Sequence, residues 1–271
     1  MMVGAPSLLT VFLRRDWAIA RSYRLGFVLG VFQIVVSLFL FFYLSEIVDD
    51  SQVSSASQLD QGYFAFVVVG LSFMKFMETG LTAFALQLRT DQTTGTLEAL
   101  LVTPARQSLV VLGSASYELL LSAVSGLLML VIAVVGFGMD LSVSLSSLLV
   151  LAAAIPASFG LFAAVGVVVA AFTIVFKQVA TLIAFAAAGV AVLAGVYFPL
   201  SVLPGWLEAI ALALPFSWAL DILRAALLGG DPSLGKLALL IGFCVIAVPA
   251  SLAVFSAAVD RAKRSGTLAQ Y

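Results

Sequence analysis

Six long runs of apolar residues, separated by short polar stretches, constrain this chain more than any other feature of its sequence. A helix needs about 20 mostly apolar residues to cross the hydrocarbon core of a bilayer, and each run reaches that length. Because backbone polar groups cannot stay unpaired in lipid, such spans must be helical. The sequence therefore predicts an all-α integral membrane protein with six transmembrane helices in one transmembrane domain. The predicted spans are 25–48, 62–88, 109–139, 145–176, 179–198 and 237–259.

Composition agrees with this prediction and excludes several classes of protein. Only 10% of the residues are charged and 63% are hydrophobic, whereas a soluble domain carries about 25% charged residues. The chain has one cysteine, Cys244, and no histidine. An internal disulfide is therefore impossible, and zinc, haem and Cys/His nucleophile chemistry have no residues to support them. We expect no metal site, no catalytic residue and no binding of nucleic acid.

The distribution of Lys and Arg predicts the orientation of the spans, because cytoplasmic loops carry an excess of these residues. One side of the membrane receives ten of them and the other side two, with Lys75 inside the second span. The ten are Arg14, Arg15, Arg21, Arg24, Arg89, Arg106, Lys177, Arg261, Lys263 and Arg264, and the two are Arg224 and Lys236. Both termini are therefore expected in the cytoplasm.

Two further segments are apolar without being spans. Residues 7–24 have the pattern of an amphipathic helix, with Trp17 on the apolar face and Arg14 opposite, which suits a helix lying in the inner membrane interface. Residues 199–230 are broken by three prolines into pieces too short to cross. Backbone of this kind at membrane depth must be buried in protein or line a wet cavity. We expect two short outer re-entrant helices, about 205–214 and 216–228.

Three charged residues lie inside predicted spans. Lys75 and Glu78 are three residues apart on one helix face, where they can pair, and Glu118 lies near the cytoplasmic end of the third span. Intramembrane charges are functional candidates by default. Two interpretations remain open: a neutralised structural pair along an interior seam, or the ion site of a self-powered secondary transporter or channel that uses all three residues.

The segment "GDPSLGKL", residues 230–237, has the spacing of a phosphate-binding loop but does not fit one. Leu237 stands where a Ser or Thr should hold Mg²⁺, no apolar strand precedes the segment, and it lies on the outer side. No cytoplasmic stretch is long enough for a nucleotide-binding fold. If ATP drives this protein, another chain must hydrolyse it.

Small residues on two spans allow close helix packing in lipid. Gly26 and Gly30 form a G-x-x-x-G at the start of the first span, and Ala184 and Ala188 lie on a small-residue face of the fifth. These positions are candidates either for packing within the chain or for contact between subunits.

The short polar segment "TGTLEALLVTPAR", residues 94–106, separates the second and third spans. Thr94 and Thr96 can cap a short helix with Glu98 in its first turn, and Pro104 can end it. The leucines of this helix form an apolar ridge at i, i+3 and i+4. We expect a cytoplasmic helix at 94–104 that either docks into a partner's groove or packs against the chain's own inner helix ends. The ridge consists of Leu97, Leu100 and Leu101.

Two stretches also resemble a known family. "GTLEALLVTPAR", between the second and third of six spans, and "YFPLSVLPGWLEAIALALPFSWALDILRAALLGG", before the last span, are similar to motifs of the type-2 ABC transporter permeases. With the six-span frame and the amphipathic lead-in, the resemblance covers nearly the whole chain. It implies a coupling helix that transmits ATP-driven motion, formed by Gly95, Leu97, Glu98, Leu100, Leu101, Thr103 and Pro104.

The resemblance also implies partners and a location. A permease of this family dimerises, here as a homodimer or a pseudo-symmetric heterodimer, with its first and fifth spans at the seam. It binds two copies of an ABC ATPase, so ATP and Mg²⁺ belong to that partner and this chain carries no cofactor. Most such systems export amphiphiles: drugs, lipids or lipid-linked glycans. The leading hypothesis is therefore an exporter permease in the plasma (inner) membrane, in contact with membrane lipid. The self-powered transporter remains the alternative, whereas an intramembrane enzyme would need a reactive cluster that the sequence lacks.

Overall fold

The computed structural model describes residues 10, 13–18, 21, 24–48, 62–95, 112–113, 115–175 and 180–265. Within these residues the regular structure is helical, with one isolated bridge between Ser142 and Leu228. The principal helices are α2 (Arg24–Ser45), α4 (Tyr63–Thr93), α7 (Ser116–Phe137), α8 (Leu145–Val175), α9 (Ala180–Leu193), α10 (Gly205–Ala213), α11 (Pro215–Leu227) and α12 (Leu234–Ser265), with a 3₁₀ turn η1 (Leu200–Val202).

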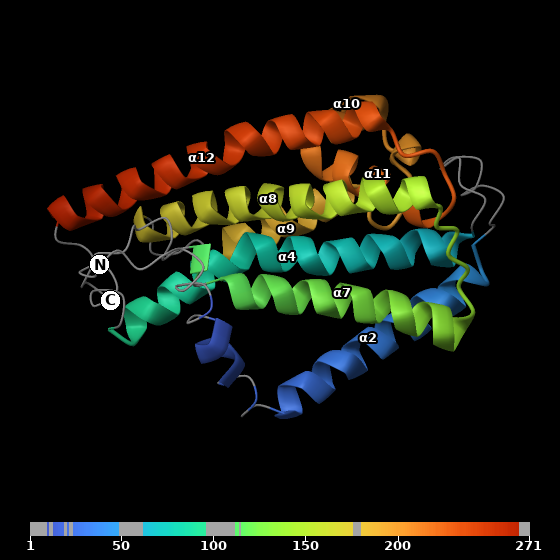
Figure 1. Ribbon diagram of the computed structural model, residues 1–271, viewed down its shortest axis with the longest axis horizontal. Coiled ribbons are helices and arrows are strands. Elements are labelled where there is room, and N and C mark those ends of the chain that lie inside the picture. Colours follow the sequence, from blue (N-terminus) through green and yellow to red (C-terminus); the bar gives the residue numbers. More distant parts are fainter. Residues whose placement is uncertain are drawn as a thin grey trace.

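The long helices lie side by side in the order α12, α8, α4 and α7, and α9 and α11 lie behind α4 and α8 (Figure 1). Among the described residues, five helices are long and apolar enough to cross a membrane: α2, α4, α7, α8 and α12. Helices α10 and α11 together would also be long and apolar enough, but they are bent by 82° at their junction. The predicted all-α integral membrane fold is therefore confirmed.

Some helix ends differ from the predicted bounds. Helix α4 continues to Thr93 and has 31 residues, which at 1.5 Å per residue is about 46 Å and exceeds a hydrocarbon core of about 30 Å. Helix α12 continues to Ser265, so its last turns carry charged residues beyond the apolar run. Helix α7 begins at Ser116, whereas the predicted span began at residue 109.

The fifth apolar run, 179–198, forms a shorter helix than predicted: α9 has 14 residues. Gly195, at φ +74°, ends it in the left-handed conformation. The amide of Val196 donates to the carbonyl of Ala191, and that of Gly195 to the carbonyl of Val192. These two bonds are the Schellman motif that closes many helices. The apolar residues after Gly195 belong to the turn that leads into η1.

Helices α10 and α11 match the two short helices predicted between the prolines. Pro215 opens α11 and has no backbone N–H to continue α10. The α10 carbonyls near the bend accept side-chain bonds instead: the Ser217 hydroxyl donates to Ala211 O at 2.6 Å, and the Trp218 indole donates to Leu212 O at 2.6 Å. Side chains thus satisfy backbone groups that the bend would leave unpaired.

The depth of α11 follows from its contacts at each end. At its start, the Phe216 ring stacks on that of Phe162, halfway along α8, with centroids 5.7 Å apart. At its end, Leu227 O accepts a 3.0 Å bond from the amide of Ser142, in the connection between α7 and α8. Helix α11 therefore runs from the middle of the bundle to the end that carries this connection.

The centre of the bundle is the contact between α4 and α8. A Cβ added at Gly166 would collide with the carbonyl oxygen of Gly80, and one added at Gly80 would collide with Phe162. The Phe76 ring packs against that of Phe159, with centroids 4.1 Å apart. Glycine pairs of this kind bring helix backbones together where lipid supplies no hydrophobic driving force.

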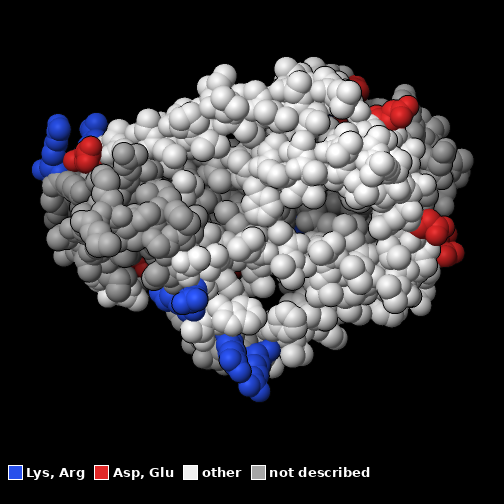
Figure 2. All heavy atoms as spheres, viewed as in Figure 1, with Lys and Arg blue, Asp and Glu red and all other residues white. Residues whose placement is uncertain are grey.

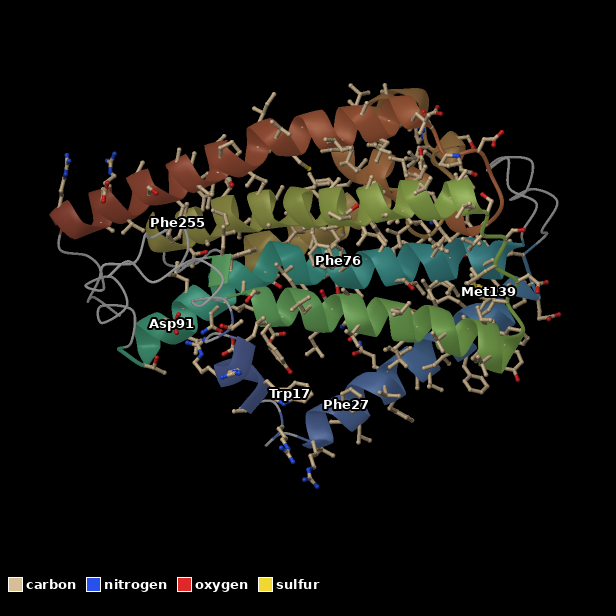
Figure 3. All side chains as sticks on the ribbon, in the orientation of Figure 1. Trp17, Phe27, Phe76, Asp91, Met139 and Phe255 are labelled. Carbon is tan, nitrogen blue, oxygen red and sulfur yellow. The ribbon has the colours of Figure 1, made fainter. Side chains whose placement is uncertain are left out.

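Helix α2 packs on the bundle only near its C-terminal end. Leu38 is its one buried residue, whereas Leu25, Phe27 and Phe32 are 71%, 64% and 64% exposed. The helix diverges from α4 toward its N-terminal end, where Phe27 lies apart from the bundle (Figures 1 and 3).

Most of the described Lys and Arg residues lie toward one end of the bundle, whereas acidic residues occur at both ends (Figure 2). Glu46, Asp140 and Asp231 follow α2, α7 and α11, at the end of the α7–α8 connection, which we name the acidic end. Arg89 and Arg261, near the ends of α4 and α12, lie at the opposite end, which we name the basic end.

Candidate functional site

One face of α4 is polar at mid-span. On a helix of 3.6 residues per turn, Lys75, Glu78, Thr79 and Thr82 project to the same side, and we name these four residues the polar face of α4. Lys75 is exposed, and the other three are partly buried. The Thr79 hydroxyl donates to Lys75 O at 3.0 Å and the Thr82 hydroxyl to Glu78 O at 2.8 Å. The hydroxyls are therefore satisfied by the helix itself, whereas the charges are not.

Lys75 and Glu78 do not pair with each other. In the part of the chain that the structure describes, ion pairs join Arg15 to Asp16 and Lys236 to Asp221. The predicted ion pair between Lys75 and Glu78 is therefore absent from the described structure.

The polar face lies between α7 and the turn that follows α9. On one side, Gly126 of α7 packs against Ser72, since a Cβ at Gly126 would lie 3.1 Å from Ser72 O. On the other side, the Tyr197 hydroxyl donates to the sulfur of Met74 at 3.0 Å. No described residue of the chain covers the exposed side chain of Lys75 between these flanks.

An aromatic cluster covers the continuation of this face toward the acidic end. The ring of Phe42 on α2 meets that of Phe64 on α4 edge-on at 5.4 Å. Phe137 of α7 contacts Phe39 and Phe42 of α2, each at 5.2 Å, and Phe64 at 5.7 Å. Edge-on pairs of this kind add stabilisation beyond the area that they bury. Helix α2 therefore covers the continuation of the polar face toward the acidic end. It does not cover the part toward the basic end, because it diverges from α4 there.

The depth of Lys75 makes its exposure costly in a bilayer. It lies twelve residues after Tyr63, which is about 18 Å along the helix, near the middle of a core about 30 Å thick. Only residues near a span's ends reach the interface by snorkelling. A charged lysine facing lipid at this depth costs about 2.5–3.5 kcal/mol or more, so this face requires protein or water beside it.

Glu118 does not belong to the polar face of α4. It lies in the first turn of α7, exposed, at the basic end of the helix. There its carboxylate interacts favourably with the positive helix end. It forms no ion pair with Lys75 in the described structure.

The residue that the sequence did not single out is Arg224 of α11, which is 4% exposed. Its Nε donates to Phe66 O at 3.2 Å, and its two terminal nitrogens donate to Gly195 O at 2.8 Å and Val196 O at 2.9 Å. Its Cζ lies 3.5 Å from the centroid of the Phe66 ring. A buried arginine is tolerated when its donors are satisfied in this way.

Arg224 joins three elements: α11, the start of α4, and the turn that ends α9. Gly70 makes the approach possible, because a Cβ there would collide with Val196 O and lie 2.7 Å from Arg224. Beside this junction, Asp221 of α11 accepts a 2.6 Å ion pair from Lys236 at the start of α12. The sequence signal that could have drawn attention to Arg224 is that it is the sole Lys or Arg within 199–230.

The candidate seam residues lie on uncovered surface. Among the described residues, no heavy atom outside the local helix lies within 4 Å of a Cβ built at Gly26 or Gly30, so these two glycines make no close packing contact with that part of the chain. Ala188 of α9 is exposed. The side chain of Ala184 lies outside the described residues.

Most of the predicted coupling helix also lies outside the described residues, among them Leu97, Glu98, Leu100, Leu101, Thr103 and Pro104. The Thr94 hydroxyl donates back to Thr90 O at 2.8 Å, and Gly95 has φ +72°. These two residues form the turn that follows α4, and the rest of the predicted coupling helix stays a prediction.

The apolar helices define a multi-pass membrane protein, and one of them, α4, carries a partly exposed polar face at mid-span. A family model described as "ABC-2 type transporter" matches residues 7–228. Because the match covers most of the chain, including every helix from α2 to α11, the chain belongs to the ABC-2 type transporter family. It is the membrane component of an ABC transport system. Comparison with curated proteins gives no match.

Proposed function

We propose that this chain is the permease subunit of an ATP-driven exporter that moves an amphiphilic substrate, such as a drug, a lipid or a lipid-linked glycan, out across the plasma (inner) membrane. ATP hydrolysis would take place on two copies of a separate ABC ATPase. The observation that carries this proposal is the family match across residues 7–228, together with the spans that it contains.

The phosphate-loop spacing at residues 230–237 does not argue for an ATP site on this chain. The spacing of 230–237 resembles a phosphate loop, but the Lys236 ammonium is engaged by Asp221 at 2.6 Å. Leu237 is buried and has no group that could hold Mg²⁺. A phosphate-binding lysine must be free to meet the phosphate.

The distribution of Lys and Arg supports the proposed orientation. These residues collect on the cytoplasmic side of membrane proteins, so the basic end would be cytoplasmic. In this orientation the end of α4 would lie where a soluble ATPase can reach it. The exposed N-terminal half of α2 and the exposed Ala188 support a dimer seam formed by α2 and α9.

A single charge placed in the leucine ridge tests the coupling. Burying one leucine contributes about 1.5–3 kcal/mol in transfer terms. Leu100→Asp should therefore abolish co-purification with the proposed ABC ATPase partner, whereas the matched control Leu100→Met should retain it. Glu98→Ala should leave assembly largely intact and reduce substrate-stimulated hydrolysis.

Membrane insertion of each variant serves as the control, since the ridge lies outside every span. Wild-type co-purification and hydrolysis in a properly inserted Leu100→Asp protein would show that 94–104 is not the coupling element. The self-powered transporter that uses Lys75, Glu78 and Glu118 would then become the better account.

A further inference from the structure

The polar face of α4 is partly exposed at mid-span, and its continuation is covered at one end. In the described structure its charges form no ion pair, and its flanks are α7 and the turn after α9. Its continuation toward the acidic end is covered by the rings of Phe42, Phe64 and Phe137. Toward the basic end α2 diverges from α4 (Figure 1), and Lys75 is exposed. Anything that reaches Lys75 in this conformation must come from the basic end or from the lipid beside it.

The charges on this face select the chemistry of what could bind. Lys75 is the cation that the structure leaves unpaired at mid-span, and helices α7 and α9 present no described acidic side chain to it. An ammonium without a carboxylate partner favours a ligand anion such as a phosphate group. Glu78, one turn toward the basic end, can accept hydrogen bonds from hydroxyl or ammonium groups of the same ligand.

The surroundings of the face suit a ligand with an apolar part. The diverging half of α2 presents Leu25, Phe27 and Leu29, which are 71%, 64% and 56% exposed, and Leu86 of α4 is 59% exposed just beyond Thr82. Hydrocarbon can lie against these side chains while a polar group meets Lys75. A small free anion would gain nothing from this apolar surface.

We propose that the polar face of α4 is the substrate-binding wall of this permease, and that Lys75 binds the anionic group of an amphiphile entering from the cytoplasmic leaflet between α2 and α4. This inference rests on the proposed function and narrows its substrate class to anionic amphiphiles. Lys75 would hold the head group, and the aromatic cluster would block its exit in the conformation seen here.

The test measures binding of a fluorescent alkyl phosphate to the full-length chain in a neutral detergent, with a trimethylammonium of the same chain length as the matched ligand. Lys75→Ala should weaken binding of the alkyl phosphate at least about tenfold, equivalent to about 1.4 kcal/mol. Lys75→Arg should remain within about threefold of wild type. Lys75→Glu should reverse the preference between the two ligands.

Lys236→Ala is the control variant, because it removes a lysine at the acidic end, away from the polar face; its binding should equal wild type. Alkyl phosphate binding by Lys75→Ala at wild-type strength would overturn the proposal. Displacement of the alkyl phosphate by inorganic phosphate alone would overturn the assignment to an amphiphile.

A further outcome separates ligand binding from subunit contact. If Lys75→Ala lowers the dimer fraction measured by light scattering and leaves binding unchanged, then Lys75 pairs across a subunit seam and the proposal fails. Co-purification of Lys75→Ala with the ATPase should stay at the wild-type level. Failure of this inference therefore leaves the exporter assignment standing, since the Leu100→Asp experiment tests that assignment independently.

Discussion

Two cations lie within the membrane bundle, and the chain treats them in opposite ways. Arg224 is buried against the ring of Phe66 and donates to three backbone carbonyls, whereas Lys75 is exposed and has no ion-pair partner in the described structure. A buried charge is tolerated when its donors are satisfied inside the chain, and removing it leaves its acceptors unpaired. A charge that has no partner within the described chain at mid-span requires a partner from outside it, and we propose that this partner is the anionic group of the substrate.

The largest effect is expected from removing the Arg224 guanidinium. Arg224→Ala would leave the buried carbonyls of Gly195 and Val196 without their side-chain donor, and each loss costs about 1–3 kcal/mol. The variant should unfold at a clearly lower temperature or fail to accumulate in the membrane. Arg224→Lys keeps the charge but not the planar fork of donors. Its unfolding temperature should therefore lie between those of the wild type and Arg224→Ala. Wild-type thermal stability for Arg224→Ala would show that the junction of α4, α9 and α11 does not depend on this residue.

Alanine substitutions at two glycines compare the tight contact between α4 and α8 with the exposed surface of α2. Gly166→Ala should destabilise the chain by about 1–3 kcal/mol, because the new methyl group meets the Gly80 carbonyl and the helices must separate. Gly30→Ala should be neutral or slightly stabilising in the monomer, since its surroundings are empty and alanine favours the helix. Chemical denaturation of the two variants in the same detergent gives the comparison. Equal losses would mean that α2 packs more tightly than the structure shows.

The asymmetry along α4 predicts a difference in access from water. In a chain whose Cys244 is replaced by Ser, Thr82→Cys should react with a membrane-impermeant maleimide added from the cytoplasmic side. Phe64→Cys, under the rings of α2 and α7, should react several-fold more slowly. Equal rates at the two positions would show that the rings of α2 and α7 do not restrict access to α4 toward the acidic end.

The smallest effect is expected at the ion pair between Asp221 and Lys236, which joins α11 to α12. Both side chains are more than a third exposed, and exposed pairs contribute about 0–1 kcal/mol. Asp221→Asn should therefore shift the unfolding midpoint only slightly, and Lys236→Gln should shift it by the same amount. A large loss in either variant would place this pair among the interactions that hold the α11 hairpin.

Local sequence rules predicted most of the long apolar helices and the two short helices α10 and α11. Apolar length located α2, α4, α8 and α12, and the prolines around residues 204 and 215 placed α10 and α11 almost to the residue. The early end of α9 was missed because Gly195 sits in an apolar run that hides its left-handed turn. Gly95, with φ +72°, forms a left-handed turn just after α4, and the coupling segment that follows it stays a prediction.

The site was harder to predict because its contacts are distant in sequence. Lys75, Glu78 and Glu118 were recognisable as charges within spans, but their lack of mutual pairing depends on side-chain directions that spacing does not determine. Arg224 donates to carbonyls 28, 29 and 158 residues away. No motif marks a backbone carbonyl as a partner, so only the folded chain reveals this junction.

The contrast between the two cations is tested most directly by thermal unfolding of Lys75→Leu and Arg224→Leu, each with and without the alkyl phosphate. Arg224→Leu should unfold at a lower temperature than wild type, and the ligand should still raise that temperature. Lys75→Leu should unfold at or above the wild-type temperature, and the ligand should no longer raise it. A lowered unfolding temperature for Lys75→Leu, with ligand stabilisation intact, would contradict the assignment of Lys75 to the substrate.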